Sequence, residues 1–298
     1  MAACSSTDPA FSKSLKPMFA IDSHHHIWDP SRGDFTWMGA EHEPINKVFS
    51  VEDLAPLLTS AQVSHTILVQ TWSSLEETET FLDLAGKTDF IAGVVGWIDL
   101  TKDAVAQLDR LKQHPAAKYL KGIRHQVHDE ADPNWLLRAD VQASLLEVAR
   151  RGLVYDLLIR PRELAASAAC VERQPDLKFV IDHIAKPRIA DGWDTDWEEG
   201  IARLAIFKDR VWIKLSGLVT EADWANWSAD DIVPYINHVI NLFGADRVMT
   251  GSDWPVCTLA ADYGSTLDLV RAAIAGRPAR EQEQILRTSA IEAYSLYA

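Results

Sequence analysis

FAIDSHHHIWDP, residues 19–30, begins with a short apolar segment and runs directly into three consecutive histidines. The segment Phe19–Ser23 predicts a strand, because strands buried on both faces of a parallel sheet are nearly continuous in apolar residues. The same pattern recurs in seven later segments: His65–Gln70, Ile91–Trp97, Tyr119–Arg124, Val154–Ile159, Lys178–Asp182, Val211–Leu215 and Arg247–Gly251. The sequence therefore predicts eight buried strands.

Amphipathic stretches lie between these strands and predict helices. They are the segment after Ser50, a polar N-cap, then Leu75–Gly86, Lys102–Gln113, Val141–Arg151, Glu163–Arg173, Asp196–Lys208, Asp230–Phe243 and two stretches after Asp262. Eight strands, each followed by a helix, predict an α/β fold, the (β/α)₈ TIM barrel. The alternative is a doubly wound open sheet, but its first turn is normally rich in glycine, and here that turn holds histidines. We expect an N-terminal tail over residues 1–19 and a single catalytic barrel domain over residues 20–298.

The composition excludes several classes of protein. The 298 residues include 29 Lys and Arg against 43 Asp and Glu, a formal net charge of −14, and 47% of them are hydrophobic. That hydrophobic fraction supports a sizeable core, and the acidic balance argues against nucleic acid or an anionic membrane as a partner. Three widely spaced cysteines without a CxxC pair suit a reducing compartment. We therefore expect a cytoplasmic protein, either a monomer or a homo-oligomer.

Histidines gather at the predicted strand ends, where barrel enzymes hold their catalytic groups. His24 and His26 are two residues apart on a strand, so their side chains point the same way. Neutral imidazole suits Zn²⁺, and a catalytic zinc takes about three protein ligands and keeps one position open for water. His183 and Asp253 would complete such a set. The sequence thus predicts one divalent metal ion, zinc, at His24, His26, His183 and Asp253, with a chance polar cluster as the alternative.

Asp253, Arg124 and His183 are the candidates for catalysis. Asp253, in GSDWP directly after the eighth strand, lies where a general base would be placed. The alternative is an N-cap or turn aspartate before Pro255. Arg124 ends the fourth strand, and its planar guanidinium recognises a carboxylate or a polarised carbonyl oxygen. A structural ion pair at the barrel rim is an equal alternative for Arg124.

Four further residues are candidates for substrate binding. Trp97 and Trp254 would line a pocket for a sugar-like ring, and His125 and Lys186 follow strand ends at the same barrel face. The chain contains no GxSxG, GxxxxGKS/T or GxGxxG motif, so we expect no nucleotide or organic cofactor.

Six segments taken together resemble the amidohydrolase superfamily: IDSHHHIWDP, VVGWIDL, LKGIRHQVHDEAD, VIDHIAKP, KLSGLVTEADW and GSDWPV, spread from Ile21 to Val256. The resemblance is to its sugar lactonase branch, the L-fucono-1,5-lactonase-like enzymes, with L-rhamnono-lactonases and 2-pyrone-4,6-dicarboxylate lactonases as relatives. It implies a barrel that hydrolyses an aldonic acid lactone, with a small-molecule sugar lactone as its partner. By position, the resemblance implies His24 and His26 as the metal pair, His183 as the strand-six histidine, Asp253 as the base and Arg124 as the contact to the lactone.

The chain departs from the superfamily pattern at two strand ends. Strand four ends in Arg124 where many members carry a bridging Lys or Glu, and strand five ends in Arg160 where they carry His, which argues against a two-metal centre. We expect a hydrolase that opens L-fucono-1,5-lactone or a related six-carbon or five-carbon sugar lactone. Asp253 would activate water, and Arg124, His125 or His183 would stabilise the oxyanion. The alternatives are a metal-dependent decarboxylase of the same superfamily, a pyrone- or muconolactone-type lactonase, and a catalytically silent carbohydrate-binding barrel.

Overall fold

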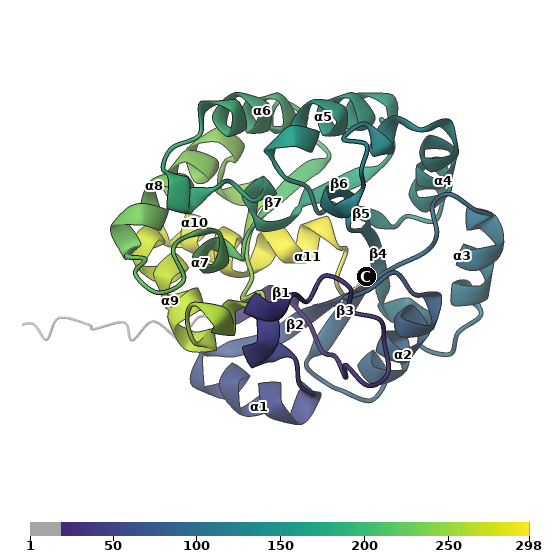
Figure 1. Cartoon of the computed structure of the whole chain (residues 1–298), viewed down its shortest axis with the longest axis horizontal. Coiled ribbons are helices and arrows are strands. Elements are labelled where there is room, and N and C mark those ends of the chain that lie inside the picture. Colours follow the sequence, from purple (N-terminus) through teal and green to yellow (C-terminus); the bar gives the residue numbers. More distant parts are fainter. Residues whose placement is uncertain (1–18, 298) are drawn as a thin grey trace, which may run out of the picture.

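The computed structural model describes residues 19–297 and contains, within them, one sheet of eight parallel strands paired in chain order (Figure 1). The strands are β1 (Ala20–His25), β2 (Val63–Val69), β3 (Ile91–Gly96), β4 (Leu120–His125), β5 (Val154–Leu157), β6 (Lys178–Ile181), β7 (Val211–Leu215) and β8 (Val248–Thr250). Helices follow the strands and surround the sheet. The predicted (β/α)₈ barrel is confirmed.

Backbone hydrogen bonds close the barrel between its first and last strands. The Asp253 amide donates to the His24 carbonyl oxygen at 2.8 Å, and the His26 amide donates to the Trp254 carbonyl oxygen at 2.6 Å. A parallel bridge pairs His25 with Trp254. All of these contacts lie at the carboxyl ends of β1 and β8, so the closure itself brings the histidine segment beside Asp253.

The helices begin and end near the positions expected from capping residues and glycines. The α helices are α1 (Val51–Ser60), α2 (Leu75–Ala85), α3 (Ala104–Lys112), α4 (Ala139–Arg150), α5 (Leu164–Arg173), α6 (Thr195–Ala205), α7 (Leu218–Glu221), α8 (Ala229–Phe243), α9 (Tyr263–Ile274), α10 (Ala279–Glu283) and α11 (Ser289–Ala293). The short 3₁₀ helices are η1 (Ala40–Ile45), η2 (Ala117–Tyr119), η3 (Val127–Asp129), η4 (Trp135–Leu137), η5 (Pro161–Glu163), η6 (Asp182–Ala185), η7 (Ile189–Asp191), η8 (Ala245–Arg247) and η9 (Val256–Leu259), and η10 (Gln284–Thr288) is a π helix. Ser50 caps α1 by accepting from the Asp53 amide, as predicted.

The core has an outer layer between sheet and helices and an inner layer inside the barrel. The inner layer consists of one apolar side chain from most strands together with the C-terminal segment: Ile21, Ile67, Val69, Val95, Val154, Val180, Trp212, Met249, Ala290, Ala293, Tyr294 and Leu296. The C-terminal segment therefore packs into the amino end of the barrel. The polar side chains described below lie at the carboxyl end.

Two expectations fall at the limits of the described chain. Residues 1–18 and 298 lie outside the described residues, so the N-terminal tail expected over residues 1–19 stays a prediction. Among residues 19–297, no helix has the length and apolar character needed to cross a bilayer.

Candidate active site

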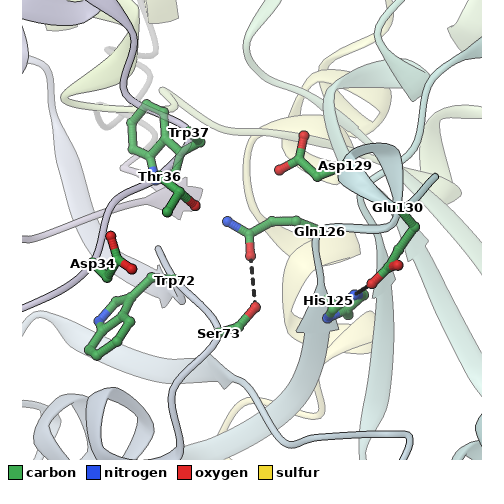
Figure 2. A pocket seen from close by; sticks show the side chains of 9 residues that line it. All are labelled: Asp34, Thr36, Trp37, Trp72, Ser73, His125, Gln126, Asp129 and Glu130. Atoms are coloured by element: carbon green, nitrogen blue, oxygen red, sulfur yellow. Dashed lines mark hydrogen bonds and ion pairs between the residues drawn. The ribbon is translucent and has the colours of Figure 1, made fainter.

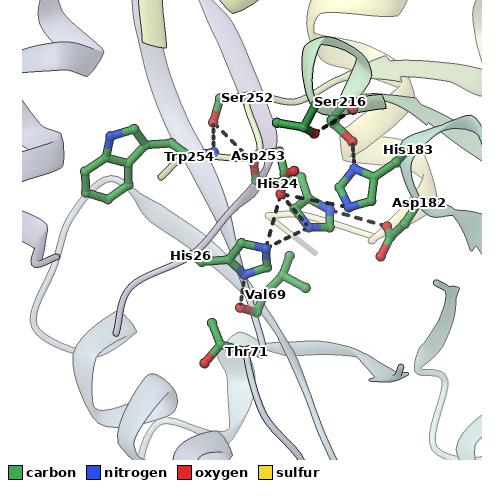
Figure 3. A network of polar contacts seen from close by, with 12 residues as sticks. His24, His26, Val69, Thr71, Asp182, His183, Ser216, Ser252, Asp253 and Trp254 are labelled. Carbon is green, nitrogen blue, oxygen red and sulfur yellow. Dashed lines mark hydrogen bonds and ion pairs between the residues drawn. The ribbon is translucent and has the colours of Figure 1, made fainter. Parts of the chain in front are cut away.

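Four side chains that the sequence singles out converge at the carboxyl ends of β1, β6 and β8 (Figure 3). His24 Nε2 and His26 Nε2 are 3.2 Å apart. Asp253 Oδ1 lies 3.3 Å from His26 Nε2, 3.7 Å from His24 Nε2 and 3.9 Å from His183 Nε2. Each of the four residues is at most 5% exposed, so they form one buried polar cluster.

Hydrogen-bond partners determine which nitrogen of each strand-one histidine carries the proton. His26 Nδ1 lies 2.8 Å from the Val69 carbonyl oxygen, which can only accept, so Nδ1 donates and Nε2 presents a lone pair. Arg124 Nη1 can only donate and lies 3.2 Å from His24 Nε2, so that nitrogen is an acceptor. His24 Nδ1 then carries the proton and faces Asp182 Oδ1 at 3.3 Å, with Lys214 Nζ 3.2 Å from the same nitrogen. Two imidazole lone pairs and the Asp253 carboxylate therefore face one another.

This donor set fits a divalent metal ion. The three atoms His24 Nε2, His26 Nε2 and Asp253 Oδ1 are separated by 3.2–3.7 Å, and the ligand atoms of a tetrahedral zinc ion with bonds of about 2.0–2.1 Å lie about 3.4 Å apart. A cation among them would relieve the repulsion between lone pairs and carboxylate. A second group, His24, Asp182 and His183, also has ligand atoms within 4.8 Å of one another, but Asp182 is already paired with Lys214 and Arg124.

Burial and neighbouring charges set the protonation states of the cluster. Burial alone would raise the pKa of Asp253, but the adjacent imidazoles, His183 first, hold its pKa below the ordinary value, so the carboxylate is ionised at neutral pH. Burial lowers the pKa of His183 to about 4 and the pKa of His24 well below its usual range. The site thus pairs an ionised carboxylate with the neutral imidazoles of His24 and His183, the forms that accept protons and bind metal.

A fully buried ion network lies beneath His24. Lys214 Nζ is 2.6 Å from Asp156 Oδ2 and 2.9 Å from Asp182 Oδ1, and Asp182 Oδ2 is 3.1 Å from Arg124 Nη1. Two cations and two anions therefore balance inside the barrel. Lys214 and His24 keep the pKa of Asp182 well below its usual range in spite of burial.

Sequence reasoning did not single out Asp156, Asp182 or Lys214 as site residues. The signal was a lone lysine inside the otherwise apolar strand VWIKL, residues 211–215, because a charge in a buried strand needs a partner. No pattern along the sequence identifies the partners of Lys214, since Asp156 belongs to β5 and Asp182 follows β6.

The guanidinium group of Arg124 forms hydrogen bonds and an ion pair with other residues of the protein. Its Nε and Nη2 donate to Gln70 Oε1 at 3.3 and 2.9 Å, and Nη2 also donates to the Gln70 backbone oxygen. Its Nη1 contacts Asp182 and His24. The side chain is 3% exposed and still lines the cavity above the cluster. Both expectations for Arg124 thus have a basis: it is a buried ion-pair partner, and it faces the pocket.

Unusual backbone conformations aim two of the four side chains into the barrel mouth. Asp253 has φ +59°, and the four residues His183–Lys186 have φ between +48° and +61°. Left-handed conformations of non-glycine residues are unfavourable and concentrate at functional sites. Gly217 makes room for the turn, because a Cβ there would lie 2.6 Å from His183 Nδ1, and Ser216 Oγ is 2.8 Å from the same nitrogen.

The four expected substrate-binding residues occupy different places. Lys186 lines the cavity above the cluster and forms an ion pair with Glu221. His125 faces away from the cluster: Trp97 Nε1 donates to its Nδ1 at 3.1 Å, so Nε2 donates to Glu130 at 2.8 Å. Trp97 and Trp254 do not line this cavity, and Trp254 is 3% exposed and packs against Phe49.

The cavity above the cluster has a volume of about 210 Å³. Its lining includes His26, Arg124, His183 and Asp253 together with the exposed Arg160. Concave sites of this kind, with a few convergent polar groups at the carboxyl-terminal face of a barrel, are typical of small-molecule enzymes.

Residues 21–296 match the family model described as amidohydrolase. The chain belongs to the amidohydrolase family. This amidohydrolase is 38% identical to an L-fucono-1,5-lactonase from Burkholderia ambifaria, over 83% of each chain, and 35% identical to an L-fucono-1,5-lactonase from Burkholderia multivorans, over 93% of this chain and 96% of the relative. It is also similar to a crystal structure of an amidohydrolase from Burkholderia multivorans with bound zinc, with a TM-score of 0.88, 34% identity and coverage of 93% of this chain and 99% of that chain.

Proposed function

We propose that this amidohydrolase hydrolyses the lactone of a sugar acid to the open-chain acid, with L-fucono-1,5-lactone as the first substrate to test. The observation that carries the proposal is the position of Asp253 Oδ1, which lies 3.3–3.9 Å from the Nε2 atoms of His26, His24 and His183 at a cavity of about 210 Å³. The names of the two Burkholderia relatives, at 38% and 35% identity, direct the proposal to sugar lactones.

In the proposed mechanism Asp253 is the general base. Its Oδ1 faces the imidazoles, and the carboxylate accepts a proton from water as the water oxygen attacks the lactone carbonyl carbon. The ester bond to the ring oxygen then breaks, and Asp253 returns the proton to that oxygen as it leaves as a hydroxyl group. Water and lactone thus give one hydroxy acid, and the carboxyl proton is released to solvent at neutral pH.

His183 is the proposed oxyanion donor. Its Nδ1 lies 2.8 Å from the Ser216 hydroxyl, and in the proposed tautomer Nδ1 accepts from that hydroxyl and Nε2, 3.9 Å from Asp253 Oδ1, carries the proton. Arg124 adds positive charge next to the reacting carbonyl, but its own N–H groups are occupied by Gln70, Asp182 and His24, so we assign it to positioning His24. Loss of one oxyanion donor costs about 3–4 kcal/mol of transition-state stabilisation.

His24, His26 and Asp253 are the proposed ligands of one divalent metal ion, with His183 beside them. Bound there, such an ion supplies Lewis-acid polarisation of the carbonyl and a lower pKa for water. Metal analysis of the purified protein tests this part separately. We expect about one equivalent of divalent metal in the wild type and in the His65→Gln control, and loss of metal in His26→Gln; unchanged metal content in His26→Gln would contradict the assignment.

The activity is tested with a pH-indicator assay on a panel of sugar lactones. We expect acid release with the wild type and a loss of at least about 10³-fold in kcat for Asp253→Asn. Asp246→Asn is the matched control, because Asp246 is exposed at the opposite end of β8. Near-normal hydrolysis by a folded Asp253→Asn protein would rule out Asp253 as the base, and carbon dioxide release from aromatic acids in place of lactone hydrolysis would favour a decarboxylase.

A further inference from the structure

A second cavity, of about 370 Å³, adjoins the catalytic pocket (Figure 2). Three side chains, Trp37, Gln126 and Asp129, line both cavities, so the two spaces share a wall. The outer cavity is larger than the catalytic pocket, whose volume is about 210 Å³. It therefore has room for a group at least as large as the one that the catalytic pocket can hold.

The lining of the outer cavity combines indole rings with hydrogen-bond acceptors. Trp37 and Trp72 lie on the same side as Asp34 in Figure 2, and Asp129 and Glu130 lie across from them. No lysine or arginine is among the described residues that line it. Indole rings pack against the C–H faces of sugars, and carboxylates accept hydrogen bonds from hydroxyl groups. This combination favours a polyhydroxylated ring over an anionic ligand.

Asp34 supplies an acceptor that the protein itself does not use. Its side chain is exposed at the cavity, and its carboxylate forms no hydrogen bond or ion pair with another residue in the range 19–297. Glu130 differs, because one of its oxygens already accepts from His125 Nε2 at 2.8 Å. Asp34 is therefore free to accept from a bound hydroxyl group.

Hydrogen bonds between loops hold the walls of the outer cavity in place. Trp37 Nε1 and Gln126 Nε2 each donate to the Thr71 carbonyl oxygen at 3.0 Å. Thr71 in turn is fixed by Glu77 of α2, which accepts from the Thr71 amide at 2.9 Å. Segments that follow β1, β2 and β4 are thus joined at one residue, and a preformed site of this kind loses little entropy on binding.

We propose that the outer cavity binds a second sugar ring, so that glycosylated sugar lactones are substrates whose lactone ring occupies the catalytic pocket. This inference rests on the lactonase function proposed above. The reaction itself is unchanged: water opens the lactone ester, and the glycosidic bond to the second ring stays intact.

The test compares lactones in pairs that share one lactone ring and differ by a hexopyranosyl group on a ring hydroxyl, with the attachment position varied. We expect at least one glycosylated lactone to have a KM about tenfold or more below that of its parent, at similar kcat. Trp72→Ala and Asp34→Asn should remove most of this difference and leave the parent lactone within about twofold of wild type. Asp246→Asn is the control for the loss of one surface charge.

The outcomes separate the two proposals. If no lactone of the panel is hydrolysed, the lactonase function fails and this inference fails with it. If parent lactones are hydrolysed but no glycosylated form has a KM about tenfold or more below that of its parent, the outer cavity is not a sugar site. The same conclusion follows if Trp72→Ala and Asp34→Asn, with melting temperatures near that of the wild type, slow parent and glycosylated lactones equally.

Discussion

Replacing Lys214 with methionine is expected to lower the free energy of unfolding by about 3–5 kcal/mol, the cost of leaving a buried charge without its partner. Lys214, Asp156 and Asp182 have fully buried side chains, with Lys214 Nζ at 2.6 and 2.9 Å from the two carboxylates. Methionine has nearly the length of lysine, so a cavity contributes little. The cost comes from two buried carboxylates that are left with Arg124 as their cation.

The loss should also depend on pH. Burial already raises the pKa of Asp156 to about 6 with Lys214 present, and removal of Lys214 raises it further. A carboxyl group whose pKa is higher in the folded protein than in the unfolded chain lowers the free energy of unfolding as the pH rises from the unfolded pKa through the folded pKa. The deficit of Lys214→Met relative to wild type should therefore be smaller near pH 5, where Asp156 takes up a proton, and larger at pH 8.

Guanidinium chloride denaturation at several pH values measures this prediction. Adding Asp156→Asn to Lys214→Met should recover part of the loss, because the surplus negative charge is gone. Lys102→Met is the control, since the Lys102 side chain is 75% exposed. A Lys214→Met protein within about 1 kcal/mol of wild type at every pH, or strictly additive effects in the double variant, would refute the buried network as described.

Three further predictions follow from single contacts. Burial raises the pKa of Glu77 from 4.5 to about 7. The free energy of unfolding of the wild type should therefore fall by about 3 kcal/mol relative to that of Glu77→Gln between pH 4.5 and 8. A constant difference between the two proteins across that range would contradict this. Tyr294→Phe removes the hydroxyl that donates to Asp156 Oδ2 at 2.7 Å and should cost about 1–3 kcal/mol in denaturant unfolding, whereas Tyr297→Phe, at a residue 59% exposed, should behave as wild type. Gly217→Ala should lose at least about tenfold in lactone hydrolysis and about 1–3 kcal/mol of stability, because its Cβ would lie 2.6 Å from His183 Nδ1 at a φ of +61°; Gly276→Ala, where a Cβ meets open space, is the control.

Most of the fold could be read from the sequence because its signals are local. Each buried strand is a short apolar run, and each of the eight predicted runs forms a strand of the barrel. The spacing of His24 and His26 on one strand likewise places two imidazoles on one side, and in the structure their Nε2 atoms are 3.2 Å apart. Periodicity within one element is sufficient for such predictions, since it depends on covalent geometry alone.

The contacts between distant segments were decided by the tertiary structure. Trp97 and His125 follow strand ends as predicted, yet they bond to each other and face away from the Asp253 cluster, because the direction of a side chain after a strand depends on where the chain turns. The ion pairs among Asp156, Asp182, Lys214 and Arg124 connect four neighbouring strands or their ends, so they form only when the barrel closes. A charge can be recognised along the chain, but its partner is chosen by packing in three dimensions, where burial makes the pairing obligatory.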